Sequence, residues 1–204
     1  MRVRNTGSGA GRGRPGRGPA ARAAVRLLAP AMAAVLAGTG VAHGLGRAEG
    51  AHWLRAWGYA VPPGDPAPGD AVTYDEELVP AGARIQVIQR VSGGTMTVEL
   101  EVRGVQPGHA FGAHVHELPC GDDPADSGPH YRNDPADGPE PANPRNEVWL
   151  DFTADSAGRG TALSRQQWVF RPGEANSVVI HEHATGHGGD AGGRVACLTV
   201  GFTD

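Results

Sequence analysis

The chain has 204 residues, of which 39% are apolar, 32 are glycine and 17 are proline. This length fits one domain, or one domain with a tail, and the glycine and proline content disfavours a long helical bundle. All 18 basic residues are arginine: residues 1–50 carry eight against one acid, a net +7, and residues 51–204 carry ten against 21 acids, a net −11. The acidic body excludes a basic nucleic-acid-binding surface as a first interpretation, so no nucleic-acid partner is expected.

The N-terminal part has the layout of a targeting signal. Residues 1–26 are rich in arginine and glycine, and an apolar run of small residues without charge follows from Leu27 to Ala42. This order is typical of a secretory signal peptide, with cleavage near Ala42 or Ala51. We therefore predict that the chain is exported, to the cell envelope or the extracellular space.

The alternative is an uncleaved membrane anchor. The apolar run has only 16 residues and is interrupted by Pro30 and by glycines, whereas a spanning helix needs about 20 apolar residues. A targeting segment over residues 1–50, with no stable membrane span after processing, is the better interpretation.

Residues 51–72 contain four prolines and two Gly-Asp pairs in their second half. This composition opposes regular structure and predicts a linker. Trp53 and Trp57 stand four apart, so they could share one helical turn that packs on the domain or on a membrane surface. A loosely ordered tail is the interpretation that we favour.

From about Thr73 the apolar residues recur with a period of two. Thr95–Arg103 is the clearest case, because Met96, Val98, Leu100 and Val102 alternate with polar residues, as a half-buried strand requires. Further strands are predicted over residues 83–91, 110–116, 148–153, 161–170, 177–181 and 195–202. An all-β domain over residues 73–204 follows, an antiparallel β-sandwich or barrel of about eight strands.

Two long segments interrupt this strand spacing, Leu118–Asn146 and Glu182–Gly193. Long loops on an otherwise short-looped sandwich are where a functional site is commonly built. Cys120 lies in the first of these loops and Cys197 in the last predicted strand. An even pair of cysteines in an exported chain predicts a disulfide, which could contribute about 4–5 kcal/mol at most; two buried free thiols are the alternative.

Seven of the nine histidines fall between positions 109 and 187. His114 and His116 are two apart on a predicted strand, so their imidazoles leave the same face and could converge on one metal ion. Alone, this pair could equally mark a polar strand face. His130 and His181 strengthen the metal interpretation, since the predicted disulfide would hold these distant segments near one another.

These residues resemble the copper/zinc superoxide dismutase family, and the matching motifs occur in the family's order over most of residues 73–204. They are Ala113-His114-Val115-His116-Glu117, Cys120, Gly128-Pro129-His130-Tyr131, Val179-Ile180-His181-Glu182 and Gly192-Gly193-Arg194-Val195-Ala196-Cys197.

The resemblance implies a Greek-key β-barrel, a Cys120–Cys197 disulfide and an Arg194 that guides an anionic substrate to copper. The copper ligands that it implies are His114, His116, His130 and His181. Imidazole ligands suit copper, and a positive element is needed because the body is acidic. An ordinary surface arginine is the alternative for Arg194.

The zinc half of the family pattern is missing. No histidine lies between His130 and His181, and the positions where zinc ligands are expected hold Arg145 and Val148. Carboxylates remain nearby, but zinc sites are built mainly from cysteine and histidine. The loop over residues 182–193 is also short. Both features indicate a copper-only member, so copper is the expected cofactor and a zinc site is expected to be absent.

Without zinc, His130 needs another partner for its second ring nitrogen. We expect Glu147 or Asp151 to accept this hydrogen bond; Glu147 is favoured, and Asp151 would then support a second copper ligand. His183 and His187 could form an extra metal position with Asp190, but solvated loop histidines are the favoured interpretation.

The expected activity is dismutation of superoxide to dioxygen and hydrogen peroxide by cycling between Cu(II) and Cu(I), with His130 as proton carrier. The alternative is an exported protein of the same fold that stores or delivers copper. Superoxide is the expected small-molecule partner, and a copper donor protein is also considered. The sequence leaves a monomer and a homodimer open.

Overall fold

The computed structural model describes residues 51–203, except 65, 68 and 136–141. Every described residue belongs to one compact unit, within Leu45–Asp204. The predicted targeting segment over residues 1–50 lies outside the described residues. Within the part that is described, no helix is long and apolar enough to cross a membrane.

Nine strands form one sheet in the described part of the chain, and its order is β6-β5-β8-β9-β2-β1-β3-β4-β7. The strands are β1 (His52–Val61), β2 (Ala71–Thr73), β3 (Arg84–Ser92), β4 (Thr95–Arg103), β5 (Ala110–His116), β6 (Phe152–Thr153), β7 (Arg159–Gln166), β8 (Ser177–His181) and β9 (Arg194–Thr199). Two single-turn 3₁₀ helices, η1 (Pro124–Ser127) and η2 (His187–Gly189), lie in the two long loops.

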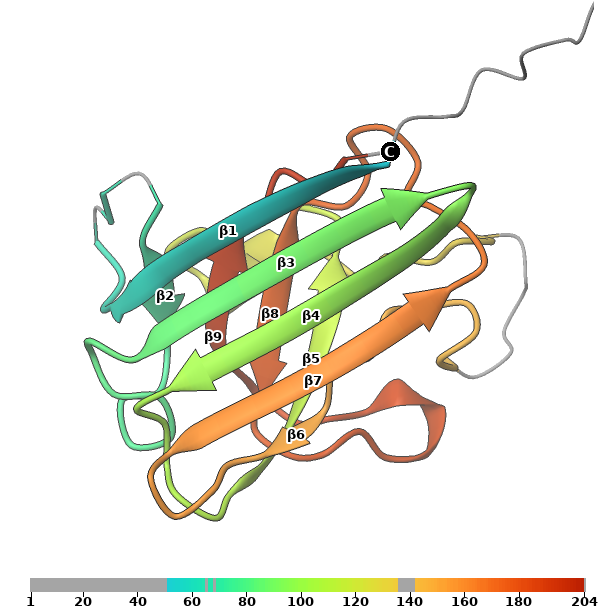
Figure 1. Ribbon diagram of the computed structural model, residues 1–204. Coiled ribbons are helices and arrows are strands. Elements are labelled where there is room, and N and C mark those ends of the chain that lie inside the picture. Colours follow the sequence, from blue (N-terminus) through green and yellow to red (C-terminus); the bar gives the residue numbers. More distant parts are fainter. Residues whose placement is uncertain (1–50, 65, 68, 136–141, 204) are drawn as a thin grey trace, which may run out of the picture. The chain divides into compact units, whose positions relative to one another are not determined.

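The sheet folds into two layers that face one another. Figure 1 shows β1, β3, β4 and β7 in one layer, with β2, β9, β8, β5 and β6 behind it. β6 and β7 stand at opposite ends of the strand order, yet they contact each other, and the Phe152 ring lies where a side chain at Gly160 would be. The sheet is therefore a nearly closed barrel.

The predicted all-β class is confirmed, with one difference. All strand pairs are antiparallel except β1 with β2, which is parallel, so the sheet is mixed. β4 pairs with β7, and β5 with β8, across long stretches of chain. Such pairings between strands distant in sequence are those of a Greek-key barrel.

Three predicted strands match the observed bounds, one with a single buried face and two that are buried on both faces. The predicted strands over residues 95–103, 110–116 and 177–181 match β4, β5 and β8. In β4 the side chains of Met96, Val98, Leu100 and Val102 are all at most 2% exposed. Each such buried apolar side chain stabilises the fold by about 1.5–3 kcal/mol.

The strand predicted over residues 148–153 is wrong for most of its length. Only Phe152 and Thr153 form a strand, although Val148 and Leu150 are fully buried. The segment before them does run along β5, through an isolated bridge between His114 and Trp149. Buried and more exposed side chains therefore alternate along this segment, although it does not form a continuous strand pairing with β5.

The linker predicted over residues 51–72 is also wrong, because its first half is a strand of the barrel. β1 pairs with β3 over eight residues, and β2 connects β1 to β9. Trp53 and Trp57 lie on the exposed face of β1, not on a helical turn. This strand was not predicted because its outward face carries aromatic residues while its inward face is also apolar, so the alternation of apolar and polar residues is weak.

The predicted disulfide is confirmed. Cys120 and Cys197 are bonded, with their Cα atoms 5.7 Å apart, and no cysteine is free. The bond joins the first long loop to β9, and the Cys120 amide donates to the Thr199 hydroxyl beside it. The loop that precedes His130 is therefore anchored to the barrel wall.

Candidate metal centre

Strand register brings the four predicted histidines to one face. His114 and His116 alternate with Ala113 and Val115, which are in the core, so both imidazoles point to the opposite side of β5. In the β5–β8 ladder His181 lies opposite Gly112, two residues before His114 and therefore on the same face. His130 forms an isolated bridge with His116. Four side chains from distant segments thus meet beside β5.

The four imidazoles are close enough to bind a single ion. One ring nitrogen of each lies within 4.8 Å of the others. His116 Nε2 and His181 Nε2 are 3.3 Å apart. His114 and His116 are fully buried and His181 nearly so, while the His130 side chain is 20% exposed. His130 is therefore the member of the cluster with access to water.

The protein holds one nitrogen of each ring and leaves the other for a metal. His116 Nδ1 donates to the Gly128 carbonyl at 2.9 Å, and His130 Nδ1 donates to Glu147 Oε2 at 3.0 Å. His114 Nε2 lies 2.7 Å from the Thr185 hydroxyl, and His181 Nδ1 makes a longer contact of 3.5 Å with the Gly192 carbonyl. Metal-binding histidines are typically held in this way through the nitrogen that does not bind the metal.

The remaining nitrogens fit a copper ion. Among the described residues, His114 Nδ1 is the one buried side-chain nitrogen or oxygen atom that lacks any hydrogen-bond partner. A buried polar atom of this kind needs an explanation, and binding of a metal ion at this nitrogen is one. Four imidazole nitrogens are also a ligand set that copper favours. The residues present therefore suit copper.

Burial keeps three of these imidazoles neutral. Desolvation, reinforced by the neighbouring imidazoles, lowers the pKa of His114 and of His116 to about 2. Burial likewise lowers the pKa of His181 to about 4, again with a contribution from His130. Since a metal binds the neutral form of imidazole, the cluster is ready to bind at neutral pH without losing protons from these three rings.

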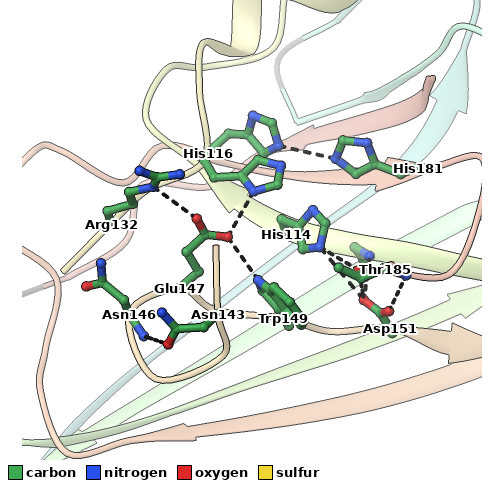
Figure 2. Close-up of polar contacts among 12 residues, drawn as sticks. His114, His116, Arg132, Asn143, Asn146, Glu147, Trp149, Asp151, His181 and Thr185 are labelled. Atoms are coloured by element: carbon green, nitrogen blue, oxygen red, sulfur yellow. Dashed lines mark hydrogen bonds and ion pairs between the residues drawn. The ribbon is translucent and has the colours of Figure 1, made fainter. Parts of the chain in front are cut away.

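Glu147 is a buried carboxylate that contacts His130, and Figure 2 shows it between Arg132 and Trp149. It is 1% exposed and accepts hydrogen bonds from three side chains: His130 Nδ1, Trp149 Nε1 at 2.9 Å and Arg132 Nε at 3.1 Å. Burial pushes its pKa up, but these hydrogen bonds more than offset burial, so the pKa lies below its ordinary value. Glu147 is therefore ionised when it meets His130.

Asp151, the alternative partner of His130, is directed toward a different ligand. Its carboxylate accepts from the hydroxyl and the amide of Thr185, both at 2.7 Å. The nearest approach to His114 is 3.9 Å, from Oδ1 to Nε2. The contact between His130 and a carboxylate is thus made by Glu147, while Asp151 stands behind His114 through Thr185.

Arg194 begins β9, opposite His181 in the ladder. Its Nη1 donates to the Pro124 carbonyl at 2.7 Å and to the Ser127 hydroxyl at 2.9 Å, and its Nη2 donates to the Gly128 carbonyl at 2.7 Å. Burial lowers the pKa of this guanidinium from its usual value. The loop of Cys120 thus holds Arg194 in place beside the histidine cluster.

The family of the chain is shown by its similarity to known proteins. Residues 82–200 match the sequence model described as copper/zinc superoxide dismutase (SODC). The chain belongs to this family. No curated protein matches it.

Two solved structures of superoxide-dismutase type are similar to it. The Cu/Zn superoxide dismutase from Brucella abortus covers 74% of this chain and 99% of its own, with 17% identity and a TM-score of 0.49. A mutant of a superoxide-dismutase-like protein from Bacillus subtilis covers 56% of this chain and 88% of its own, with 13% identity and a TM-score of 0.44.

The other histidines of the superoxide dismutase domain lie outside the cluster. His183 and His187 are exposed, and His183 faces Glu182 with 3.7 Å between Nε2 and Oε1. His109 lies in the loop before β5 and hydrogen-bonds the Glu182 carbonyl at 2.6 Å. Neither exposed histidine belongs to the metal-binding group found in the described residues.

Several residues that orient the cluster have no signal in the sequence. Gly128 and Gly192 act through backbone carbonyls, which every residue type provides. Thr185 is an ordinary threonine in a loop of glycine, alanine and histidine. Arg132 and Trp149 could have been suspected only after Glu147 was placed.

Proposed function

We propose that this chain is a copper-dependent superoxide dismutase that works without zinc. The observation that carries the proposal is the arrangement of four imidazoles, each with one nitrogen held by the protein and the other turned toward a common point, with Arg194 fixed nearby. Copper bound to these nitrogens supplies one-electron chemistry, since it exchanges between Cu(II) and Cu(I).

Arg194 would attract and orient the superoxide anion. Two N–H groups on Nη1 and one on Nη2 are used for holding the loop. Among the described contacts, the second Nη2 hydrogen and the Nε hydrogen have no partner. A cation with free donors in an otherwise acidic body concentrates an anionic substrate locally.

His130 would deliver the protons that the reaction consumes, because two superoxide anions and two protons give dioxygen and hydrogen peroxide. It has the exposure to exchange protons with water, which the other three ligands lack. Glu147 fixes its tautomer, since a carboxylate can only accept and so requires the proton on Nδ1. This leaves His130 Nε2, which is directed at the cluster, as the atom that would bind copper and that, when it is not bound to copper, would gain and give the proton.

Glu147 also supports the copper-only proposal. It occupies the second nitrogen of His130, the nitrogen that would otherwise be available to a second ion. Arg132 and Trp149 complete the hydrogen bonding of this carboxylate. A buried, fully hydrogen-bonded carboxylate thus takes the orienting role that a metal would have.

The test is metal content and dismutase rate of the purified chain, loaded with copper alone or with copper and zinc. We expect bound copper at one equivalent and equal rates in both preparations. His181→Asn should abolish the rate, whereas the matched change His187→Asn on the exposed loop should leave it unchanged. A zinc requirement would contradict the copper-only proposal, and bound copper without any rate would identify a copper carrier.

We also propose that the protein works outside the cytoplasm. The disulfide supports this, because such bonds persist in oxidising compartments. Fractionation of cells that express the full chain checks it: the oxidised protein is expected in the envelope or medium, and a reduced cytoplasmic protein would contradict it.

A further inference from the structure

Thr185 lies between the carboxylate of Asp151 and the copper-site histidine His114. Its hydroxyl oxygen is 2.7 Å from Asp151 Oδ1 and 2.7 Å from His114 Nε2. The direct separation of His114 Nε2 and Asp151 Oδ1 is 3.9 Å, which is too long for a hydrogen bond. Figure 2 shows the three side chains in this order. The hydrogen-bonded connection between the carboxylate and the imidazole therefore passes through the hydroxyl.

The hydrogen atoms in this chain can be assigned from donor and acceptor capacity. The carboxylate of Asp151 can only accept, and a hydroxyl has a single hydrogen to donate. The Thr185 hydrogen therefore points at Asp151 Oδ1, and its oxygen must accept from His114. The proton of neutral His114 then lies on Nε2, and Nδ1, the buried nitrogen without a partner, carries the lone pair.

The backbone fixes the hydroxyl in this position. The Thr185 amide donates to Asp151 Oδ2 at 2.7 Å, so the carboxylate holds the residue at two points. The Gly112 amide donates to the His183 carbonyl at 2.6 Å, which ties the loop to β5. A side chain at Gly112 would lie 2.7 Å from the His183 oxygen and 3.1 Å from Thr185 Oγ1. The close approach of the loop therefore depends on glycine at this position.

We propose that Thr185 is a positioning residue that holds His114 in the Nε2–H tautomer and so presents Nδ1 to the metal. The inference deepens the proposed function, since it concerns a ligand of the same copper centre. The orienting partner is not the same for all the histidines. His116 and His130 donate directly to an acceptor, whereas His114 is oriented by a carboxylate that acts through a hydroxyl. Loss of such an orienting partner typically weakens metal binding 10–100-fold.

The experiment compares Thr185→Val, which removes the hydroxyl at similar volume, with Thr185→Ser, which retains it. Thr161→Val on the exposed face of β7 is the matched control. In the metal-free full chain, ¹⁵N–¹H correlation spectra of labelled histidines report which ring nitrogen carries the proton. We expect the His114 Nε2–H form in the parent, the serine variant and the control, and its loss in Thr185→Val.

Copper affinity, measured by competition with a chelator, is the second measurement. Thr185→Val should bind copper 10–100-fold more weakly, with serine restoring the parent value. An unchanged Nε2–H signal in Thr185→Val, or an Nδ1–H signal in the parent, would overturn the proposal. If the parent binds no copper, the proposed function fails, yet the tautomer spectra of the metal-free chain still decide the role of Thr185.

Discussion

His116 and Arg194 donate hydrogen bonds to the same oxygen atom, the carbonyl of Gly128. His116 Nδ1 lies 2.9 Å from it and Arg194 Nη2 lies 2.7 Å from it. One peptide group thus orients an imidazole of the histidine cluster and the cation beside it. Gly128 has a φ of 69°, a left-handed conformation that favours glycine. The relative position of this imidazole and the guanidinium is therefore set by a backbone conformation in the disulfide-anchored loop.

Replacing Arg194 with glutamine should lower the rate of superoxide dismutation about tenfold, because attraction of an anion by a local charge is worth roughly this much in association rate. The salt dependence of the rate should weaken as well. Arg194→Lys should be intermediate, since it retains charge but not the planar fork. Pulse radiolysis over a range of ionic strengths measures both, with exposed Arg145→Gln as control; a rate and salt slope equal to the parent would disprove the guiding role.

Replacing Glu147 with glutamine should impair both stability and turnover. The amide presents an N–H₂ group to at least one of the donors His130, Trp149 and Arg132, so a partly buried donor loses its partner next to a buried amide, at a cost of about 1–3 kcal/mol. Urea unfolding measures this loss of stability. The control is Glu99→Gln, which removes a charge from the surface pair with Arg90 and should cost less than about 1 kcal/mol of unfolding free energy. Unchanged turnover at saturating copper across pH would remove Glu147 from the mechanism.

The metal-free protein should lose stability in mild acid. The folded-state pKa values of His114 and His116, at about 2, and of His181, at about 4, lie below the unfolded value of 6.5 because the rings are buried. Between pH 6.5 and 4 the unfolded chain binds more protons than the folded chain, so stability present above pH 6.5 is lost as pH falls. Three such groups give a slope of up to about 4 kcal/mol per pH unit. Denaturant titrations at pH 7, 6 and 5 measure it, and a flat profile would be inconsistent with buried neutral rings.

Gly58→Ala tests whether β1 belongs to the barrel. A Cβ at this position would lie 2.2 Å from the Gly69 carbonyl oxygen and 2.7 Å from the Ala71 amide nitrogen, both backbone atoms that cannot rotate away. We expect a loss of about 1–3 kcal/mol in unfolding free energy. Gly201→Ala, where a Cβ would meet nothing within 4 Å, is the control. Equal midpoints for the two variants would contradict the pairing of β1 described here.

Local chemistry made part of this structure predictable. A strand with one dry and one wet face must alternate, so Thr95–Arg103 could be recognised from its own residues. β1 escaped recognition because Trp53, Trp57 and Tyr59 are exposed apolar residues on its outer face. Its burial against β3 is a property of the assembled sheet, which no short window of sequence contains.

The candidate metal centre likewise has features that could be predicted from the sequence and features that could not. The sequence by itself identified the four histidines and Arg194, because they stand in motifs that resemble those of the superoxide dismutase family, and it favoured Glu147 over Asp151 as the partner of His130. The tertiary structure alone decided which nitrogen of each ring is free, that His116 and Arg194 share the Gly128 carbonyl, and that Thr185 stands between Asp151 and His114. These contacts join residues far apart in the sequence and involve backbone carbonyls and a hydroxyl. Such groups are so common in any chain that the sequence does not indicate which residues they contact.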